Sequence, residues 1–222
     1  MKKSYFITGT DTDSGKTYIT AGLLTAFKKQ GYSTLGIKPI SAASQDPYLL
    51  QEAASVKLPM EIINPISLKI PAAPHIEAKH SGLPLDSKMV IEKIQPILSH
   101  AVDVILVEGV GGWLVPLNNT QTMADVVKEL NMDVILVVGM RLGCLNHALL
   151  TVQAILNSHV KLKGWIANCI DPKMGFLDEN ISTLADRIKA PLLGTVPFGG
   201  NVEDYVDLRK LNQEGVQDDQ SN

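Results

Sequence analysis

The sequence has few of the residues that build disulfide frameworks or zinc sites. It contains only two cysteines, Cys144 and Cys169, which lie far apart in the chain and belong to no CxxC or Cys/His pattern. Disulfide-stapled domains and structural zinc sites need several such residues at characteristic spacing. The cysteine usage therefore indicates neither kind of site, and it fits a reducing compartment.

Basic clusters and long hydrophobic runs are scarce as well. The formal net charge is -3, and the lysines and arginines form no stripe, so we expect neither a nucleic-acid partner nor a membrane partner. Apolar runs such as Val134 to Val138 are too short to span a bilayer. Lys2 and Lys3 precede an apolar run that ends at Thr8, which is not the pattern of an export signal. We expect a soluble, cytoplasmic protein that acts on small molecules.

The hydrophobic pattern predicts an α/β fold. At 222 residues and 45% hydrophobic composition, the chain can bury one sizeable core, and no linker divides it. Helical patterns at Thr17 to Lys29 and Asn146 to Leu156 alternate with short runs that are apolar throughout, as in strands buried on both faces. These runs are Tyr5 to Ile7, Thr34 to Ile37, Val102 to Val107, Val134 to Val138, Trp165 to Ile170 and Leu192 to Val196.

Such an alternation predicts a mainly parallel central sheet with helices on both faces. We expect one domain over residues 1–212, followed by a frayed polar tail over residues 213–222. The proline-rich stretch 40–84 interrupts the rhythm, and we interpret it as an excursion over the substrate side. Because ligands of such sheets bind at the carboxyl ends of the strands, the residues directly after each run are candidates for a site.

The segment after the first run has the features of a phosphate-binding loop. It reads GTDTDSGKT from Gly9 to Thr17 and leads into a helical pattern. Its backbone N–H groups would surround an anion, with Lys16 at the outer phosphates and the Thr17 hydroxyl on Mg²⁺. Five residues, rather than the usual four, separate Gly9 from Gly15, and a glycine-rich helix start is the alternative. The order of strand, turn, lysine-threonine and helix favours a P-loop NTPase-like three-layer sandwich.

Two carboxylates are candidate magnesium ligands. Glu108 follows the third buried run and precedes Gly109, and Mg²⁺ on a triphosphate usually takes one or two protein carboxylates. Its alternative role is a solvated strand end. Asp46 is the second candidate, with a helix cap before Pro47 as the alternative.

Lys38 is a candidate catalytic residue. It follows the second run and precedes Pro39, which would leave the ammonium over the crevice. An ordinary surface lysine is the alternative. In the functional interpretation, Lys16 and Lys38 flank the transferred phosphoryl group and oppose the charge that develops on its oxygens.

Four segments together resemble the dethiobiotin synthetase family. They are GTDTDSGKT, IKP at residues 37–39, VEGVGGW at residues 107–113 and RLGCLNHALLT at residues 141–151. The similarity extends nearly end to end and is weak over residues 40–71 and in the tail. Family members usually read KP-x-x-SG, whereas this chain reads KPISAA from Lys38. Either Ser41 takes the substrate contact of the displaced serine, or that contact is missing.

The resemblance implies ATP-dependent closure of a ring on 7,8-diaminononanoate with CO2, which yields dethiobiotin. Carbamate formation on one amine, phosphorylation of the carbamate and attack by the second amine would account for the use of ATP. The resemblance also implies Mg²⁺ and a homodimer, because the LGCLNH segment in the family reaches into the substrate pocket of the other subunit.

The resemblance assigns residues to each ligand. Lys16 and Lys38 would be catalytic, and Thr17, Asp46 and Glu108 would hold magnesium. Substrate would contact Ser41, Gly143, Cys144 and Asn146. The implied ATP-binding residues are Thr12, Asp13, Ser14, Gly15, Lys16, Thr17, Tyr18, Asp46, Glu108, Gly109, Val110, Gly111, Asn168, Cys169, Pro197, Phe198 and Gly199.

Several of these residues have ordinary alternative roles. Without the resemblance, Asn168 reads as a strand-end turn residue and Phe198 as core. Cys144 reads as a small buried hydrophobe rather than a reactive thiol. His75 and His147 also match family positions, yet we leave both out of the catalytic set because a lone histidine is more often a packed or hydrogen-bonded residue.

Two other classes share parts of this pattern. A cobyrinic-acid-type amide ligase has a related P-loop, but such chains carry a glutaminase domain for which this chain is too short. A partitioning or localisation ATPase usually has a lysine early in the P-loop, where this chain has Thr10, and often a basic or amphipathic surface.

Overall fold

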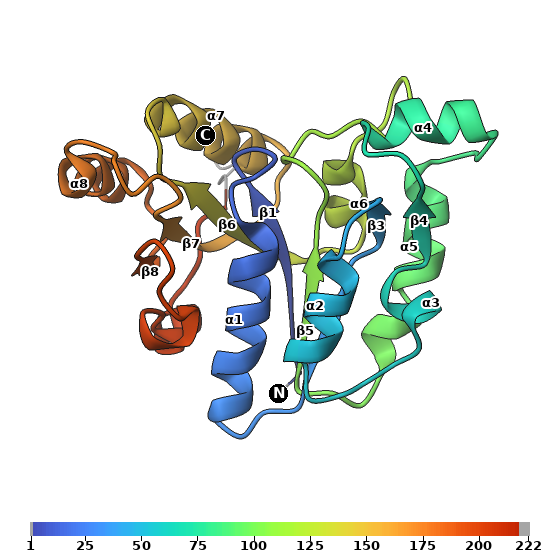
Figure 1. Cartoon of the computed structure of the whole chain (residues 1–222), viewed down its shortest axis with the longest axis horizontal. Coiled ribbons are helices and arrows are strands. Elements are labelled where there is room, and N and C mark those ends of the chain that lie inside the picture. Colours follow the sequence, from blue (N-terminus) through green and yellow to red (C-terminus); the bar gives the residue numbers. More distant parts are fainter. Residues whose placement is uncertain (1, 218–222) are drawn as a thin grey trace.

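Six parallel strands form the central sheet of the computed structural model, which describes residues 2–217. The strand order is β2-β5-β1-β6-β7-β8, and every neighbouring pair is parallel (Figure 1). The predicted mainly parallel sheet is therefore confirmed. The strands are β1 (Lys3–Gly9), β2 (Thr34–Ile37), β5 (Val104–Glu108), β6 (Asp133–Gly139), β7 (Leu162–Asn168) and β8 (Leu192–Val196).

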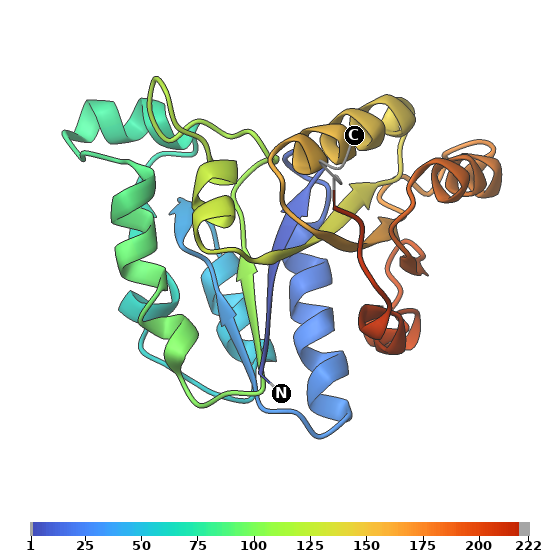
Figure 2. The same ribbon diagram turned by 180° about the vertical axis from the view of Figure 1, so that it is seen from behind.

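Helices cover both faces of the sheet. Successive residues of each strand point to opposite sides, and because nearly all of them are apolar, both faces need to be buried. Phe6 packs into the core on one face, while Tyr5 and Ile7 pack into the core on the other. The first face, which is turned toward the viewer in Figure 2, is covered by α5 (Ser87–Ile94), α6 (Met123–Glu129), α7 (Cys144–Asn157) and α8 (Leu177–Arg187). The second, on which α1 and α2 lie in front of the strands in Figure 1, is covered by α1 (Lys16–Lys29), α2 (Asp46–Ala53), η2 (Val202–Asp204) and η3 (Leu208–Asn212). Burial on both faces explains why the strands read as unbroken apolar runs.

The stretch 40–84 folds beside the edge of the main sheet. Its strands β3 (Ile40–Ala42) and β4 (Ile66–Leu68) pair in parallel as a small separate sheet. The short helix α3 (Met60–Ile63) lies between them in the sequence, and α4 (Pro74–Ser81) follows β4. The sequence left this segment unassigned, because strands of three residues carry no periodicity that a pattern can detect.

Two further features complete the architecture. The short helix η1 (Ile97–Ser99) leads toward β5. Val216 exchanges two main-chain hydrogen bonds with Leu162 of β7, at 2.8 and 2.9 Å. The first part of the expected frayed tail, residues 213–217, is thus tied to the sheet, and residues 218–222 lie outside the described part. Within residues 2–217, no helix has the length and apolar character needed to cross a membrane.

Candidate active site

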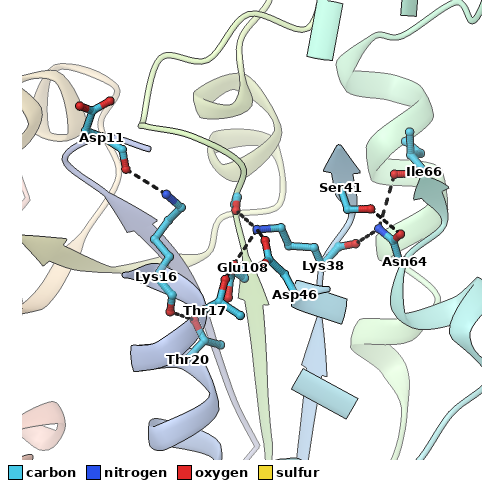
Figure 3. Close-up of polar contacts among 11 residues, drawn as sticks. Asp11, Lys16, Thr17, Thr20, Lys38, Ser41, Asp46, Asn64, Ile66 and Glu108 are labelled. Carbon is cyan, nitrogen blue, oxygen red and sulfur yellow. Dashed lines mark hydrogen bonds and ion pairs between the residues drawn. The ribbon is translucent and has the colours of Figure 1, made fainter. Parts of the chain in front are cut away.

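The carboxyl ends of β1, β2 and β5 open into a cavity of about 700 Å³. Figure 3 shows polar side chains from the P-loop, the end of β2, the start of α2 and the end of β5 converging at this edge. The expected excursion reaches the same place, since residues 42–46 and 71–74 contribute to the wall. The lining residues are Thr12, Asp13, Gly15, Lys16, Thr17, Tyr18, Lys38, Ala42, Ser44, Asp46, Pro71, Ala72, Ala73, Pro74, Val110, Gly111, Val115 and Pro116.

The segment after β1 has the geometry of a phosphate cradle. Asp13 and Gly15 both adopt left-handed backbone conformations, with φ of 60° and 84°. Gly15 stands at the N-cap of α1 and has no side chain to occupy the first free N–H groups of the helix. A Cβ at Gly15 would lie 2.0 Å from Nδ2 of Asn168, so no other residue fits there without displacement. The loop therefore presents a helix N-terminus to an anion.

Lys16 is buried at the base of this loop. Its ammonium donates a hydrogen bond to the main-chain oxygen of Asp11 at 3.0 Å. Burial, followed by repulsion from Lys38, lowers the pKa of Lys16 to about 8. Because both effects disfavour the charged form, a bound polyphosphate that neutralises the ammonium would be favoured here.

Lys38 lies at the centre of a buried charge cluster. Its ammonium is 2.6 Å from Oε1 of Glu108 and 3.0 Å from Oδ2 of Asp46, and it donates to the main-chain oxygen of Gly109 at 3.0 Å. Lys38 is 3% exposed and Glu108 is fully buried. Burial alone would lower the pKa of Lys38, but the attraction of Glu108 and then Asp46 outweighs it, so that the pKa is raised. Lys38 is held as a cation at the end of β2, which is not the ordinary surface position of a lysine.

Three oxygen-bearing side chains fit a magnesium ion. The Thr17 hydroxyl donates to Oε1 of Glu108 at 2.7 Å, whereas Oε2 of Glu108 is buried without a hydrogen-bond partner. Burial would raise the pKa of Asp46, but Lys38 outweighs it and the pKa is lowered, so this carboxylate stays charged. A hydroxyl and two carboxylates are the donors that Mg²⁺ prefers, and a buried oxygen without a partner is a position for a cation to satisfy. Within the described part of the chain, no group of three or more His, Cys, Asp or Glu side chains is arranged to hold a metal ion.

The predicted adenine side lies beside the P-loop, outside the cavity wall. Asn168 is the last residue of β7, and its Nδ2 donates to the main-chain oxygen of Ser14 at 2.9 Å. The Tyr18 hydroxyl donates to the main-chain oxygen of Gly200, which joins the start of α1 to the loop after β8. Phe198 in that loop is 64% exposed, so the alternative role of a core residue is wrong.

Other members of the expected ATP set occupy varied positions. Ser14 is buried, and its Oγ has no partner. Cys169 is buried, and burial raises the pKa of its thiol, as for an unreactive cysteine. Gly109 faces Lys38 through its main-chain oxygen. Pro197 and Gly199 flank Phe198 and, like it, lie outside the cavity wall.

The four predicted substrate residues lie outside the cavity wall of their own chain. Ser41 is 2% exposed and donates to Oδ1 of Asn64 at 2.7 Å, whereas Ala42 lines the cavity. Gly143 has φ of 93° at the N-cap of α7, and Cys144 behind it is buried. Asn146, by contrast, is exposed on the first turn of that helix.

The loop before α7 is nevertheless connected to the P-loop. Arg141 forms an ion pair with Oδ2 of Asp11 at 2.7 Å. The other carboxylate oxygen of Asp11 accepts from the Thr12 N–H at 2.8 Å. Asp11 therefore joins the phosphate cradle to Arg141, three residues before α7 begins.

Sequence reasoning missed some of the residues around the cavity. Ala42, Val115, Pro116 and residues 71–74 line it with apolar or main-chain groups that carry no motif. Asn64 and Arg141 act through hydrogen bonds to other site residues. Of these residues, only Arg141 carried a sequence signal for a role in the site, because it directly precedes the LGCLNH segment.

Comparison with known proteins first shows to which broad class of proteins this chain belongs. A family model described as an AAA domain matches residues 3–204. The cell division protein FtsY of Thermotoga maritima is similar with a TM-score of 0.59 at 15% identity, covering 95% of this chain and 66% of that chain. A chain of the MinC:MinD cell division protein complex of Aquifex aeolicus gives a TM-score of 0.57 at 16% identity, covering 88% of this chain and 81% of that chain. These likenesses, with the phosphate cradle, define a P-loop nucleotide-binding protein and confirm the predicted three-layer fold.

Curated relatives then narrow the class. The ATP-dependent dethiobiotin synthetase BioD of Cellvibrio japonicus is 47% identical over 205 residues, which cover 88% of this chain and 90% of the relative. Its counterpart in Nitrosospira multiformis is 44% identical and covers 95% of each chain. The one in Pseudomonas aeruginosa is 42% identical and covers 94% of this chain and 97% of the relative. This chain belongs to the dethiobiotin synthetase family and is therefore a ligase, as the sequence motifs predicted.

Proposed function

We propose that this chain uses ATP and CO2 to close the ureido ring of dethiobiotin on 7,8-diaminononanoate, releasing ADP and phosphate. The observation that carries the proposal is that Lys16, Thr17, Lys38 and Asp46 line one cavity. Behind them, the buried Glu108 bonds to Thr17 and Lys38. The dethiobiotin synthetases at 42 to 47% identity support the choice of substrate.

The proposed reaction has three steps. One amine of the substrate attacks CO2 and loses a proton, which gives a carbamate. A carbamate oxygen then attacks the γ-phosphorus of ATP, which forms a carbamic-phosphoric anhydride and expels ADP. The second amine attacks the carbonyl carbon and loses a proton. The bond between that carbon and the bridging oxygen breaks, and inorganic phosphate leaves with the former carbamate oxygen. Phosphorylation thus converts a poor leaving oxygen into a good one.

The protein contributes position and charge in this scheme. The first N–H groups of α1 and the ammonium of Lys16 hold the β and γ phosphates. Lys38 approaches the same region from β2, held between Glu108 and Asp46, and would bind the carbamate and the transferred phosphoryl oxygens. Such preorganised cations are worth most in a buried site, where they need no reorganisation during the reaction.

Thr17, Asp46 and Glu108 would hold magnesium, which when bound neutralises charge on the β and γ phosphates. Asn168, Cys169, Pro197, Phe198 and Gly199 would surround the adenine, since the loops after β7 and β8 adjoin the P-loop.

We place the enzyme in the cytoplasm as a homodimer. Gly143, Cys144, Asn146 and their exposed neighbour Leu142 lie at the start of α7, and the first three do not line the cavity of their own chain. A second copy that brings this segment to the cavity would supply main-chain N–H groups and the Asn146 amide to the substrate carboxylate.

The test combines protein, Mg·ATP, bicarbonate and 7,8-diaminononanoate, with ADP and the ring product followed together. We expect ADP release to depend on the diamine and to match product formation one for one. Lys38→Ala should lose this turnover, and Lys88→Ala should keep it, because the Lys88 side chain is 81% exposed on α5. ADP release that is indifferent to the diamine would refute the proposal.

A further inference from the structure

Asn64 holds the main chain of Lys38 through a buried amide. It lies between α3 and β4 and is 8% exposed. Its Nδ2 donates to the main-chain oxygen of Lys38 at 2.7 Å and to that of Ile66 at 3.4 Å, and its Oδ1 accepts from the Ser41 hydroxyl (Figure 3). One side chain thus connects the end of β2 with both strands of the small sheet.

The main-chain oxygen of Lys38 lies just outside the regular hydrogen bonding of the main sheet. Strand β2 ends at Ile37, one residue before Lys38, and Pro39 after Lys38 has no N–H to donate. The Lys38 N–H donates to the main-chain oxygen of Ile63 at 2.9 Å. Both polar main-chain groups of Lys38 are therefore bonded to residues 63 and 64, which fixes the backbone from which the side chain extends.

This backbone position determines where the ammonium lies. The Lys38 side chain has four rotatable bonds, and its reach to Glu108, Asp46 and the Gly109 oxygen depends on where its Cα stands. A buried carbonyl that lost its donor would pull away to find another partner. The ammonium would move with it.

We propose that Asn64 is a positioning residue for Lys38: its amide holds the turn after β2 so that the lysine ammonium faces the transferred phosphoryl group. Asn64 does not line the cavity, so its effect passes through Lys38. The inference rests on the proposed function for the role of Lys38. The buried Ser41 would then orient the Asn64 amide, because its hydroxyl donates to Oδ1 of Asn64.

The first test is Asn64→Asp, which keeps the acceptor for Ser41 but removes both amide donors. Since a displacement of 1 Å at a reacting group costs about a hundredfold in rate, we expect kcat to fall by about that factor while the KM for ATP stays close to wild type. Asn118→Asp is the matched control. Its Nδ2 also donates to a main-chain oxygen, that of Leu85, and Asn118 lies outside the cavity wall. The control should keep its kcat per folded molecule.

The second measurement needs no substrate. Acetylation of individual lysines by a small amine-reactive acyl donor such as acetic anhydride, followed by mass spectrometry, reports how accessible Lys38 is. Its side chain is 4% exposed in the wild type. We expect Lys38 to be labelled faster in Asn64→Asp than in the wild type or in Asn118→Asp. A wild-type kcat, or unchanged labelling of Lys38, would overturn the proposal.

If Asn64→Asp does not fold, Asn64→Ser carries the same two measurements, because its shorter hydroxyl is uncharged and adds no repulsion to the cluster. Wild-type protein without diamine-dependent turnover would refute the proposed function, whereas the labelling of Lys38 tests Asn64 whatever the substrate is.

Discussion

Neutralising Lys38 should destabilise the protein, whereas neutralising Lys16 should not. Lys38→Met and Lys16→Met each remove a buried ammonium and keep a side chain of similar length. The pKa of Lys38 is raised, because Glu108 and Asp46 outweigh the cost of burial, so the folded state favours its charged form. The pKa of Lys16 is lowered to about 8 by burial, so the folded state disfavours its charged form.

The size of the effect follows from the fully buried Glu108. Lys38→Met leaves this carboxylate without its 2.6 Å partner, and removal of one member of a buried pair costs about 3 kcal/mol or more. For a chain of this size, each kcal/mol shifts Tm by about 2–4 °C. We therefore expect Tm to fall by roughly 6–12 °C. Lys16→Met removes no ion pair with a carboxylate and should leave Tm unchanged or higher.

The assay is thermal unfolding of the wild type and both variants at pH 7, in EDTA and without nucleotide. The sign of the linkage gives a second check, because a raised lysine pKa stabilises the folded state fully below pH 10.5 and loses this contribution as the pH rises through the folded pKa. The gap between wild type and Lys38→Met should thus persist from pH 7 to pH 9. Equal losses of Tm in both variants would refute the assignment of Lys38 as the cation that compensates Glu108.

Three further predictions follow from the site. ATP should bind the wild type more weakly as the pH rises above about 8, where Lys16 loses its proton, while the affinity of Lys16→Met should stay nearly flat; titration calorimetry across pH measures both, and parallel profiles would contradict it. Arg141→Ala should cost less than about 1 kcal/mol of stability, because the ion pair of Arg141 with Asp11 is exposed. It should nevertheless raise the KM for the diamine more than the KM for ATP. An equal rise in both KM values would show that this ion pair does not position the start of α7 for substrate binding. Gly15→Ala should lose ATP binding, because its Cβ would meet Asn168 and its φ is positive, and normal nucleotide affinity in this variant would refute the described loop geometry.

Much of the fold could be predicted because its strands are buried on both faces. Val104 to Val107 alternate between two cores, so each position is apolar and the run is visible without any partner. The phosphate cradle was equally visible, since its glycine, lysine and threonine are dictated locally. Glu108 differs slightly from expectation: it is the last residue of β5 and still pairs with Ile7, rather than following the strand.

The substrate side could not be predicted in the same way. The side-chain direction of Ser41 is set by the pairing of β3 with β4, residues that lie 26 positions apart in the register, and no local pattern encodes this pairing. In the folded chain, Ala42 lines the cavity and Ser41 does not. The role of Asn64 could not be predicted for a similar reason. Its amide donates to main-chain oxygens that any sequence would provide, and its side-chain partner Ser41 lies 23 residues away in the sequence.

In the proposed reaction, a carbamate oxygen attacks the γ-phosphorus of ATP. Oxygen labelling tests this step: CO2 labelled with ¹⁸O is supplied with the diamine and Mg·ATP, and the reaction is quenched before the label exchanges with water. Ring closure breaks the bond between the carbonyl carbon and the bridging oxygen, so we expect one labelled oxygen in each released phosphate and one in the ureido carbonyl. Phosphate that carries no label while dethiobiotin forms would show that the carbamate is not phosphorylated.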